Sequence, residues 1–326
     1  MVADPAGGPL TWSVAAASVA GNSHTAVGRG SDDAYSYALV SGGTGLVAAV
    51  ADGAGSKTGT SAWGSFTACQ VVAAHADGLV ASVRTKSEAE SALRNVFGAV
   101  LSAIEEQAGR MNLAPSDLST TLAVAVLGPS AGAFAQVGDG IVVCDLVGEP
   151  SVRIAEDKGE YANETAFVTS SGALKRHLRL EYRDAGTDRF ALSTDGLRYK
   201  LLNIHDGGTA FVPFFTSLWD KLEVVEIPED SLSAFLAKLD DQTGDDKTLI
   251  VGTRTRLDAH GARARLAGVR ASSPPPVASG EVLSPGASAA PPVEEPTGTD
   301  EGVATEDKSR EKIGKRGLLR RWEGFL

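Results

Sequence analysis

The sequence predicts an α+β fold built mainly from antiparallel strands. Its middle part holds short runs rich in Val, Ala and Leu that follow one another between Gly and Pro residues. Such runs are typical of consecutive strands joined by tight connections. A long stretch with helical periodicity precedes them, which favours helices packed on one face of a sheet. The four runs cover residues 118–127, 133–137, 141–147 and 151–156.

The chain is expected to open with three strands. A mostly apolar run over residues 10–20 is long enough for the first, and alternating residues over 35–40 predict the second. Five small apolar residues over 47–51 run directly into Asp52 and Gly53. This third run is typical of a buried strand that delivers one carboxylate at its end.

Two helices are expected next. Small and apolar residues dominate 58–80, and Ser87 with Glu90 forms a capping box that predicts the start of a second helix. Apolar residues then recur at steps of three and four, which predicts a buried stripe on that helix. The stripe consists of Ala89, Leu93, Val96, Phe97, Val100, Leu101, Ile104 and Ala108.

The second half of the domain continues the mixed pattern. Further strands are predicted over 167–170, 177–182 and 189–193, and residues 197–228 look irregular. A short amphipathic helix over 231–239 and a strand over 248–253 are expected to close the domain.

Composition divides the chain into three regions. Residues 1–257 predict one globular domain, in a chain that is 43% hydrophobic. Residues 258–307 are rich in Pro, Ala, Ser, Gly and Glu, so we expect a disordered linker there. Residues 308–326 mix Lys and Arg with Ile, Leu, Trp and Phe, which indicates a basic amphipathic tail that docks a protein partner or a membrane surface. The alternative for this tail is a solvated chain end.

Charge and cysteine content exclude several classes of protein. The formal net charge of −11 argues against a nucleic-acid partner. The two cysteines, Cys69 and Cys144, stand in apolar surroundings and are interpreted as small core residues. The start lacks the basic and apolar regions of a secretory signal, and no run of about eighteen apolar residues occurs. We therefore expect a cytoplasmic protein.

Five aspartate sites stand next to predicted strands. A single Asp-Gly after a strand is usually a turn, but five such sites spread over more than two hundred residues suggest that the fold gathers them. Gathered carboxylates repel one another and need divalent cations. Oxygen ligands without His or Cys favour Mg²⁺ or Mn²⁺ over zinc. The five sites are Asp32-Asp33, Asp52-Gly53, Gly138-Asp139-Gly140, Asp195-Gly196 and Asp245-Asp246.

Taken in order, these motifs resemble the metal-dependent protein phosphatases of the protein phosphatase 2C type. Between the first two Asp-Gly sites the chain also carries the family's Ser119-Thr120-Thr121-Leu122. Gly21-Asn22-Ser23-His24, Asp52-Gly53-Ala54-Gly55-Ser56 and the segment 159–165 are similar to a bacterial branch of that family. The resemblance covers roughly residues 11–255.

The resemblance implies a four-layer α-β-β-α sandwich, with two mainly antiparallel sheets flanked by helix pairs. It also implies a phosphatase that hydrolyses phosphoserine and phosphothreonine with a water activated by two metal ions, opposing a bacterial Ser/Thr kinase. The resemblance implies that Asp52 would bridge both ions, with the Gly53 carbonyl as a ligand to one of them. Asp195 and Asp245 would complete the first site, and Asp33, with Asp32, would hold the second ion through water. Asp139 with Asp195 would support a third ion. Asp246 is the less favoured ligand of its pair.

Two further residues are assigned by the resemblance. Relatives carry an Arg upstream of the first acidic pair that binds the substrate phosphate, and Arg29 is the local candidate, at a shorter spacing from Asp32. Some relatives place a His general acid after the first Asp-Gly, where this chain has Ala54. His24 or a metal-bound water is the candidate for that role.

Two functional readings stay open at this point. The first is the metal-dependent phosphatase acting on a phosphoprotein. The second is a catalytically weak phosphatase-like scaffold that binds phosphoprotein or regulates a partner. Neither cysteine has an Arg at the Cys-x5-Arg spacing, which argues against a cysteine phosphatase. No Gly-x4-Gly-Lys-Ser/Thr loop occurs, which argues against a nucleotide hydrolase.

Overall fold

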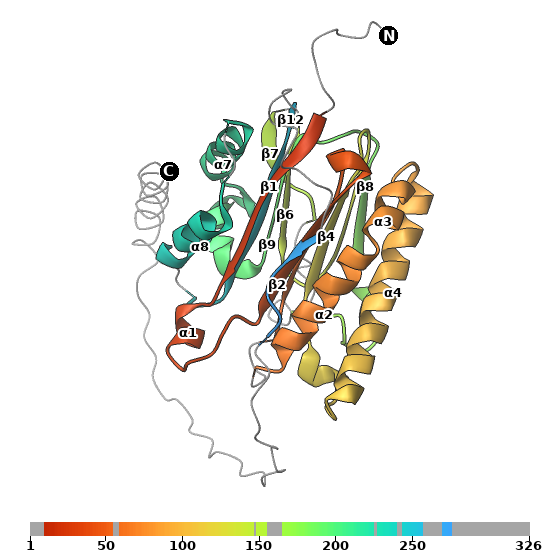
Figure 1. Ribbon diagram of the computed structural model, residues 1–326, viewed down its shortest axis with the longest axis vertical. Coiled ribbons are helices and arrows are strands. Elements are labelled where there is room, and N and C mark those ends of the chain that lie inside the picture. The colour runs from red at the N-terminus through yellow and green to blue at the C-terminus, as the bar shows by residue number, and fades with distance from the viewer. Residues whose placement is uncertain are drawn as a thin grey trace, which may run out of the picture.

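Two antiparallel sheets pack face to face, and helices cover the outer face of each (Figure 1). The computed structural model describes residues 10–54, 59–146, 148–154, 165–224, 227–239, 243–256 and 269–275. This arrangement confirms the predicted α+β fold with four layers.

The first sheet has five strands, in the order β1-β12-β9-β6-β7. Its two longest strands come from opposite ends of the domain, and they pair over ten positions, from Leu10 opposite Arg256 to Val19 opposite Lys247. The sheet thereby ties the start of the domain to its end. The strands are β1 (Leu10–Val19), β12 (Lys247–Arg256), β9 (Arg189–Ser193), β6 (Ile141–Leu146) and β7 (Glu149–Val152).

The second sheet has six strands, in the order β13-β2-β3-β4-β5-β8. Both faces of its β3 strand are buried. Val47 and Ala49 point toward the helices, whereas Leu46 and Ala48 point toward the other sheet, as the two-residue period of a strand requires. The strands are β13 (Val269–Ala271), β2 (Asp33–Val40), β3 (Gly45–Asp52), β4 (Leu122–Leu127), β5 (Gly132–Val137) and β8 (Arg179–Arg183).

Three helices cover the outer face of the second sheet: α2 (Ser61–Ala74), α3 (Ala76–Ser82) and α4 (Lys86–Arg110). The single helix predicted over 58–80 is in fact two, which meet at His75. The predicted stripe of α4 is buried at all of its positions except Leu101, which is partly buried. Its predicted cap is wrong, because the side chain that accepts the Glu88 backbone N–H belongs to Thr85.

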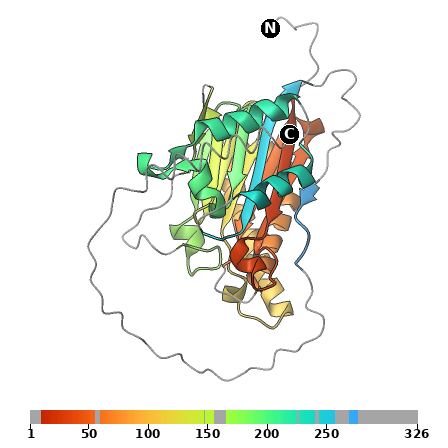
Figure 2. The same cartoon turned by 90° about the vertical axis from the view of Figure 1, so that its left-hand side faces the viewer.

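Two helices cover the outer face of the first sheet, α7 (Val212–Val224) and α8 (Glu229–Lys238), and Figure 2 shows them lying across its strands. The strands pack on Phe215, Trp219 and Phe235 from these helices. The prediction of irregular structure over 197–228 is therefore wrong for α7. The predicted helix over 231–239 is confirmed as α8.

Short elements connect the layers. The strand predicted over 167–170 is wrong, because these residues form turns in which the Ser170 N–H donates to the Phe167 carbonyl. The short helices are α1 (Asn22–Thr25), α5 (Ala173–Arg176) and α6 (Arg198–Leu201). The 3₁₀ turns are η1 (Ser41–Gly43), η2 (Pro115–Leu118), η3 (Asp195–Leu197) and η4 (Ile204–Asp206), and β10 (Leu202–Asn203) pairs with β11 (Thr209–Ala210).

Part of the predicted linker is a strand. β13 lies within residues 258–307, yet it pairs with β2 and forms the edge of the second sheet (Figure 1, blue). The prediction of disorder is wrong there, because backbone pairing with an open sheet edge orders a segment that carries few apolar side chains. The predicted tail 308–326 lies outside the described residues. No helix in the described part of the chain is long and apolar enough to cross a membrane.

Candidate metal centre

Asp33 and Asp52 stand directly opposite each other in neighbouring strands. Asp33 begins β2, Asp52 ends β3, and the two are register partners in the antiparallel ladder. Directly opposed residues point to the same face of a sheet, so their carboxyl groups are neighbours. Burial raises the pKa of both carboxyl groups well above the usual range. Neighbouring aspartates raise the pKa of Asp52 further, Asp33 most strongly among them.

A hydroxyl-rich segment holds the main chain at Asp52. The Thr121 N–H and the Thr120 hydroxyl both donate to the Asp52 carbonyl, at 2.8 and 2.9 Å. The Asp52 N–H donates in return to Thr121 Oγ1, at 3.0 Å. The Ser-Thr-Thr-Leu motif of the sequence thus positions the first Asp-Gly. Gly53 must be glycine, since a Cβ there would lie 2.8 Å from the Asp32 carbonyl oxygen and 2.9 Å from Ser61 main-chain atoms.

Asp195 follows β9, in η3, and enters the same cluster from the first sheet. Burial, together with the carboxylates of Asp139 and Asp245, raises its pKa to about 7. Its Oδ1 atom is buried and has no hydrogen-bond partner. A Cβ on Gly196 would lie 1.8 Å from the Asp246 carbonyl oxygen, so only glycine lets this turn pack against the 245–246 loop.

Asp139 and Asp245 complete the gathered set. Asp139 lies between β5 and β6 and accepts a hydrogen bond from the Thr165 hydroxyl at 2.9 Å. Asp245 precedes β12, and its Oδ1 accepts the Asp246 N–H at 2.9 Å. Because both raise the pKa of Asp52 as well as that of Asp195, all four carboxylates belong to one electrostatic cluster.

The chemistry of this cluster suits a hard divalent cation. It contains buried carboxylate oxygens and the unpartnered Asp195 Oδ1, and Mg²⁺ and Mn²⁺ bind such oxygens. Mutual repulsion opposes close approach of these groups. In the described part of the chain, no group of three or more His, Cys, Asp or Glu side chains is arranged around one ion position.

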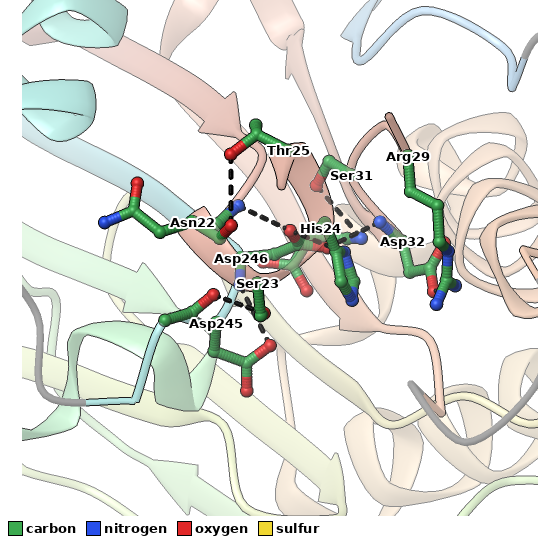
Figure 3. Close-up of polar contacts among 12 residues, drawn as sticks. Asn22, Ser23, His24, Thr25, Arg29, Ser31, Asp32, Asp245 and Asp246 are labelled. Carbon is green, nitrogen blue, oxygen red and sulfur yellow. Dashed lines mark hydrogen bonds and ion pairs between the residues drawn. The ribbon is translucent and has the colours of Figure 1, made fainter. Parts of the chain in front are cut away.

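Asp246 contacts the α1 segment, and its carboxylate also raises the pKa of Asp33. Its carboxylate accepts the Gly21 N–H at 2.8 Å and the Asp32 N–H at 2.6 Å, and His24 Nδ1 lies 2.9 Å from its Oδ1 (Figure 3). With both oxygens engaged, Asp246 links the α1 region to the last acidic loop. Sequence reasoning placed it only as a secondary metal ligand, although the Asp245-Asp246 doublet was visible.

Asp32 and Arg29 form an ion pair at the rim of the site. Arg29 Nη2 lies 2.5 Å from Asp32 Oδ2 (Figure 3). The Ser61 hydroxyl donates to the same oxygen at 3.2 Å. Burial raises the pKa of Asp32, and the Arg29 guanidinium partly offsets this increase. The Arg29 side chain is 28% exposed, whereas His24 is buried. Arg29 thus contacts Asp32, the chain neighbour of Asp33, and His24 lies beside Asp246, the chain neighbour of Asp245.

The family model for protein phosphatase 2C matches residues 20–237, about two thirds of the chain. The chain belongs to the protein phosphatase 2C family. The matched range ends before Asp245, which the pairing of β12 with β1 and β9 nevertheless brings to the same end of the sandwich.

Known bacterial phosphatases share sequence or fold with this chain. The chain is 32% identical over 150 residues to serine/threonine-protein phosphatase 3 of Escherichia coli strain K12, and the match covers 44% of the chain and 58% of that relative's length. A solved bacterial serine phosphatase superposes with a TM-score of 0.52 at 16% identity, covering 77% of this chain and all of that one. A serine/threonine phosphatase of Staphylococcus aureus gives 0.51 at 15% identity, covering 78% and 98%. At these identities the two structures bear on the fold alone.

Proposed function

We propose that this chain is a metal-dependent protein serine/threonine phosphatase that acts on phosphoproteins and opposes a Ser/Thr kinase. Membership of the protein phosphatase 2C family supports the reaction class. The observation that carries the proposal is the electrostatic cluster at one end of the sandwich. There, Asp33 and Asp52 are cross-strand partners, and Asp195, Asp139 and Asp245 raise the pKa of Asp52.

Mg²⁺ or Mn²⁺ ions would be held by aspartates of this cluster. Asp52 with the Gly53 carbonyl, Asp195 and Asp245 would hold one ion. Asp33 would hold a second, with Asp52 contributing to both and Asp32 acting indirectly. Asp139 with Asp195 would hold a third ion if one binds. When bound, such ions lower the pKa of water and neutralise the charge of a phosphate under attack.

The protein's own contribution begins with binding the phosphate. Arg29 is partly exposed at the rim of the cluster, and its guanidinium is suited to phosphate oxygens because it donates two parallel hydrogen bonds. Its ion pair with Asp32 limits the orientations of the Arg29 side chain before substrate arrives. Asp32 in turn is fixed by two hydrogen bonds. The Ser61 hydroxyl donates to the Asp32 carboxylate, and the Asp32 backbone N–H donates to the Asp246 carboxylate.

Hydrolysis of a phosphothreonine peptide tests the proposal. Purified protein is assayed with Mn²⁺, with Mg²⁺ and with EDTA, beside Asp52→Asn and Asp195→Asn. We expect turnover that depends on the metal and falls by at least about 100-fold in both variants, because each loses a charged ligand. Asp184→Asn is the matched control, since Asp184 is exposed and follows β8 at the opposite end of the second sheet.

Two outcomes contradict the proposal. Turnover that persists in EDTA, or that survives in both variants, would show that the aspartate cluster and its metal ions take no part in the reaction. Absence of turnover with either metal, combined with retained phosphopeptide binding, would favour the scaffold reading instead.

A further inference from the structure

We propose that Asp246 and His24 form a positioning pair that fixes the α1 segment against the metal end of the sandwich. This inference rests on the proposed function, because the groups held in place are the proposed metal ligands and the phosphate-binding Arg29. Neither residue of the pair touches the reacting atoms. Both act through the segments that they join.

The Asp246 carboxylate is a buried acceptor with three polar neighbours. It is 2% exposed, and its two oxygens accept backbone N–H groups from Gly21 and Asp32. His24 Nδ1 lies 2.9 Å from Oδ1, the oxygen that also accepts the Gly21 N–H (Figure 3). A buried carboxylate is stable only when its oxygens are satisfied, and here the donors come from both ends of one segment, residues 21–32.

A second set of contacts joins the same two regions. The Ser23 N–H and the Ser23 hydroxyl both donate to the Gly244 carbonyl, at 2.9 and 2.5 Å. A Cβ on Gly21 would lie 2.2 Å from that carbonyl oxygen and 2.3 Å from Asp245 main-chain atoms. The α1 turn therefore packs backbone to backbone against the loop that carries Asp245.

These contacts link residues far apart in sequence. The hydrogen bond from the Asp32 N–H to Asp246 spans 214 positions, and it fixes the peptide between Ser31 and Asp32, one residue before Asp33. On the other side Asp246 is the chain neighbour of Asp245. One carboxylate thus sets the relative positions of two proposed ligands, one from each sheet. Residues that orient metal ligands in this way change metal affinity by about 10–100-fold when they are replaced.

His24 has two possible roles, proton donor to the leaving group and partner of Asp246. The structure favours the second. The His24 ring is buried, its Nδ1 lies 2.9 Å from Asp246 Oδ1, and its carbonyl accepts the Arg29 N–H at 2.9 Å. His24 therefore connects the Asp246 carboxylate to the main chain of Arg29.

Metal binding is the first test. Mn²⁺ affinity is measured by titration calorimetry on metal-stripped protein, with thermal unfolding in EDTA as the check on folding. We expect Asp246→Ala to bind Mn²⁺ about 10–100-fold more weakly. Asp246→Asn should lose less Mn²⁺ affinity, since one acceptor oxygen remains.

Ser23→Ala removes a single exposed hydroxyl contact, so it keeps the fold and should shift Mn²⁺ affinity a few-fold in the same direction. Asp184→Asn should match the unaltered chain.

Leaving-group dependence is the second test. p-Nitrophenyl phosphate expels a stable phenolate that needs no proton, whereas a phosphothreonine peptide expels an alkoxide that does. For a positioning residue, His24→Gln should lower kcat/KM by the same factor on both substrates and weaken Mn²⁺ binding. A loss confined to the peptide, with unchanged Mn²⁺ affinity, would overturn the inference and make His24 the proton donor.

The failure of this inference can be told apart from failure of the proposed function. If the unaltered chain binds Mn²⁺ and Asp246→Ala, folded in EDTA, binds it equally well, the positioning pair is wrong and the phosphatase stands. If the unaltered chain neither binds Mn²⁺ nor hydrolyses phosphate esters, the proposed function is wrong, and this inference falls with it.

Discussion

Hydroxyl side chains support the gathered aspartates. Thr194 donates to Asp33 Oδ2 at 2.7 Å, and Thr165 donates to Asp139 Oδ2 at 2.9 Å. Hydrogen bonds to a carboxylate favour its charged form and offset part of the cost of burying it. These small residues therefore keep the carboxylates in place without supplying an opposite charge, which leaves the carboxylates available to bind a cation.

Removing the Thr194 hydroxyl, which donates to the Asp33 carboxylate, gives a first prediction. Thr194→Val keeps the shape of the side chain but leaves the buried Asp33 oxygen without this donor. It also removes the acceptor of the Thr248 N–H. We expect the free energy of unfolding to fall by about 1–3 kcal/mol, as measured by urea denaturation in EDTA. Thr194→Ser retains the hydroxyl and should stay close to wild type, and an equal loss in both variants would contradict this account.

The raised pKa of Asp195 gives a second prediction, for the protein kept in EDTA. Because the folded state holds this proton up to a pKa of about 7, against a reference value of 3.8, folding gains stability below about pH 4. That stability is lost as the pH rises through about 7. Asp195→Asn cannot ionise, so between pH 4 and pH 8 it should lose about 1–3 kcal/mol less stability than wild type.

Urea denaturation across that pH range measures the difference. The expected size is below the full linkage value because neighbouring aspartates share the bound protons. Asp184→Asn, with its exposed carboxylate, should follow the wild-type profile. Parallel profiles for wild type and Asp195→Asn would show that Asp195 is ionised throughout.

Sequence reasoning located the aspartates but not most of their partners. Each Asp-Gly carries its own local signature, a strand followed by glycine, so Asp52 and Asp195 were visible without a structure. The partners of Asp246 could not be identified from the sequence, since its carboxylate accepts the N–H groups of Gly21 and Asp32, which lie more than two hundred positions away. Such contacts depend on which strands become neighbours, and no local pattern encodes that.

At the scale of elements, the start of α4 gives a third prediction. The Thr85 side chain accepts the Glu88 N–H, whereas Ser87, which the capping-box pattern selected, lies inside the first turn. Thr85→Ala should cost about 1 kcal/mol, since an unpaired helix N–H loses its acceptor. Ser87→Ala should cost close to nothing, because alanine is the better helix former at that position.

Thermal unfolding of the two variants checks this directly. A loss of 1 kcal/mol corresponds to a fall in Tm of about 2–4 °C for a domain of this size. Both substitutions remove one hydroxyl at the same exposed helix end, so each controls for the other. A larger fall for Ser87→Ala would restore the capping box predicted from the sequence.

The α7 helix shows why one element escaped prediction. Its buried residues have the spacing of a helix, but Pro213 and two adjacent phenylalanines at its start resemble an irregular apolar anchor. Proline is tolerated in the first turn of a helix because a backbone N–H at that position would have no intrahelical acceptor, so the N–H that proline lacks is not missed. The helix is held in place from the sheet, since Trp219 Nε1 donates to the Phe190 carbonyl on β9 at 2.9 Å. The buried residues are Phe214, Phe215, Leu218, Trp219 and Leu222.

At the scale of the whole molecule, three apolar cores alternate with the four layers. One core lies between the two sheets, where Trp12 and Phe190 meet edge to face with ring centroids 5.4 Å apart. The other two lie between each sheet and its helices. Because both faces of each sheet are covered in this way, the sheet ends are the regions left for chemistry, and the acidic cluster occupies one of them.

The layers could be predicted, but the edge of the second sheet could not. Strand and helix order, read together with the family resemblance, led to the four-layer sandwich. β13 is three residues long and stands in Pro-rich surroundings, so its side chains give no strand signal. What orders it is the backbone of β2, an open edge that accepts a partner strand of almost any sequence.

This edge gives the last prediction. A chain ending at residue 275 keeps β13 and three hydrogen bonds between Ser272 and Tyr35. The Ser272 N–H and hydroxyl both donate to the Tyr35 carbonyl, and the Tyr35 N–H donates to Ser272 Oγ. A chain ending at residue 256 loses β13 and these hydrogen bonds. It exposes the edge of β2, the strand that begins at Asp33. We expect the shorter chain to be less stable by about 1–3 kcal/mol, a fall in Tm of several degrees. It should also be more prone to associate through the open edge. Thermal unfolding and light scattering at matched concentrations compare the two, and equal Tm values would mean that β13 contributes nothing to the sheet it joins.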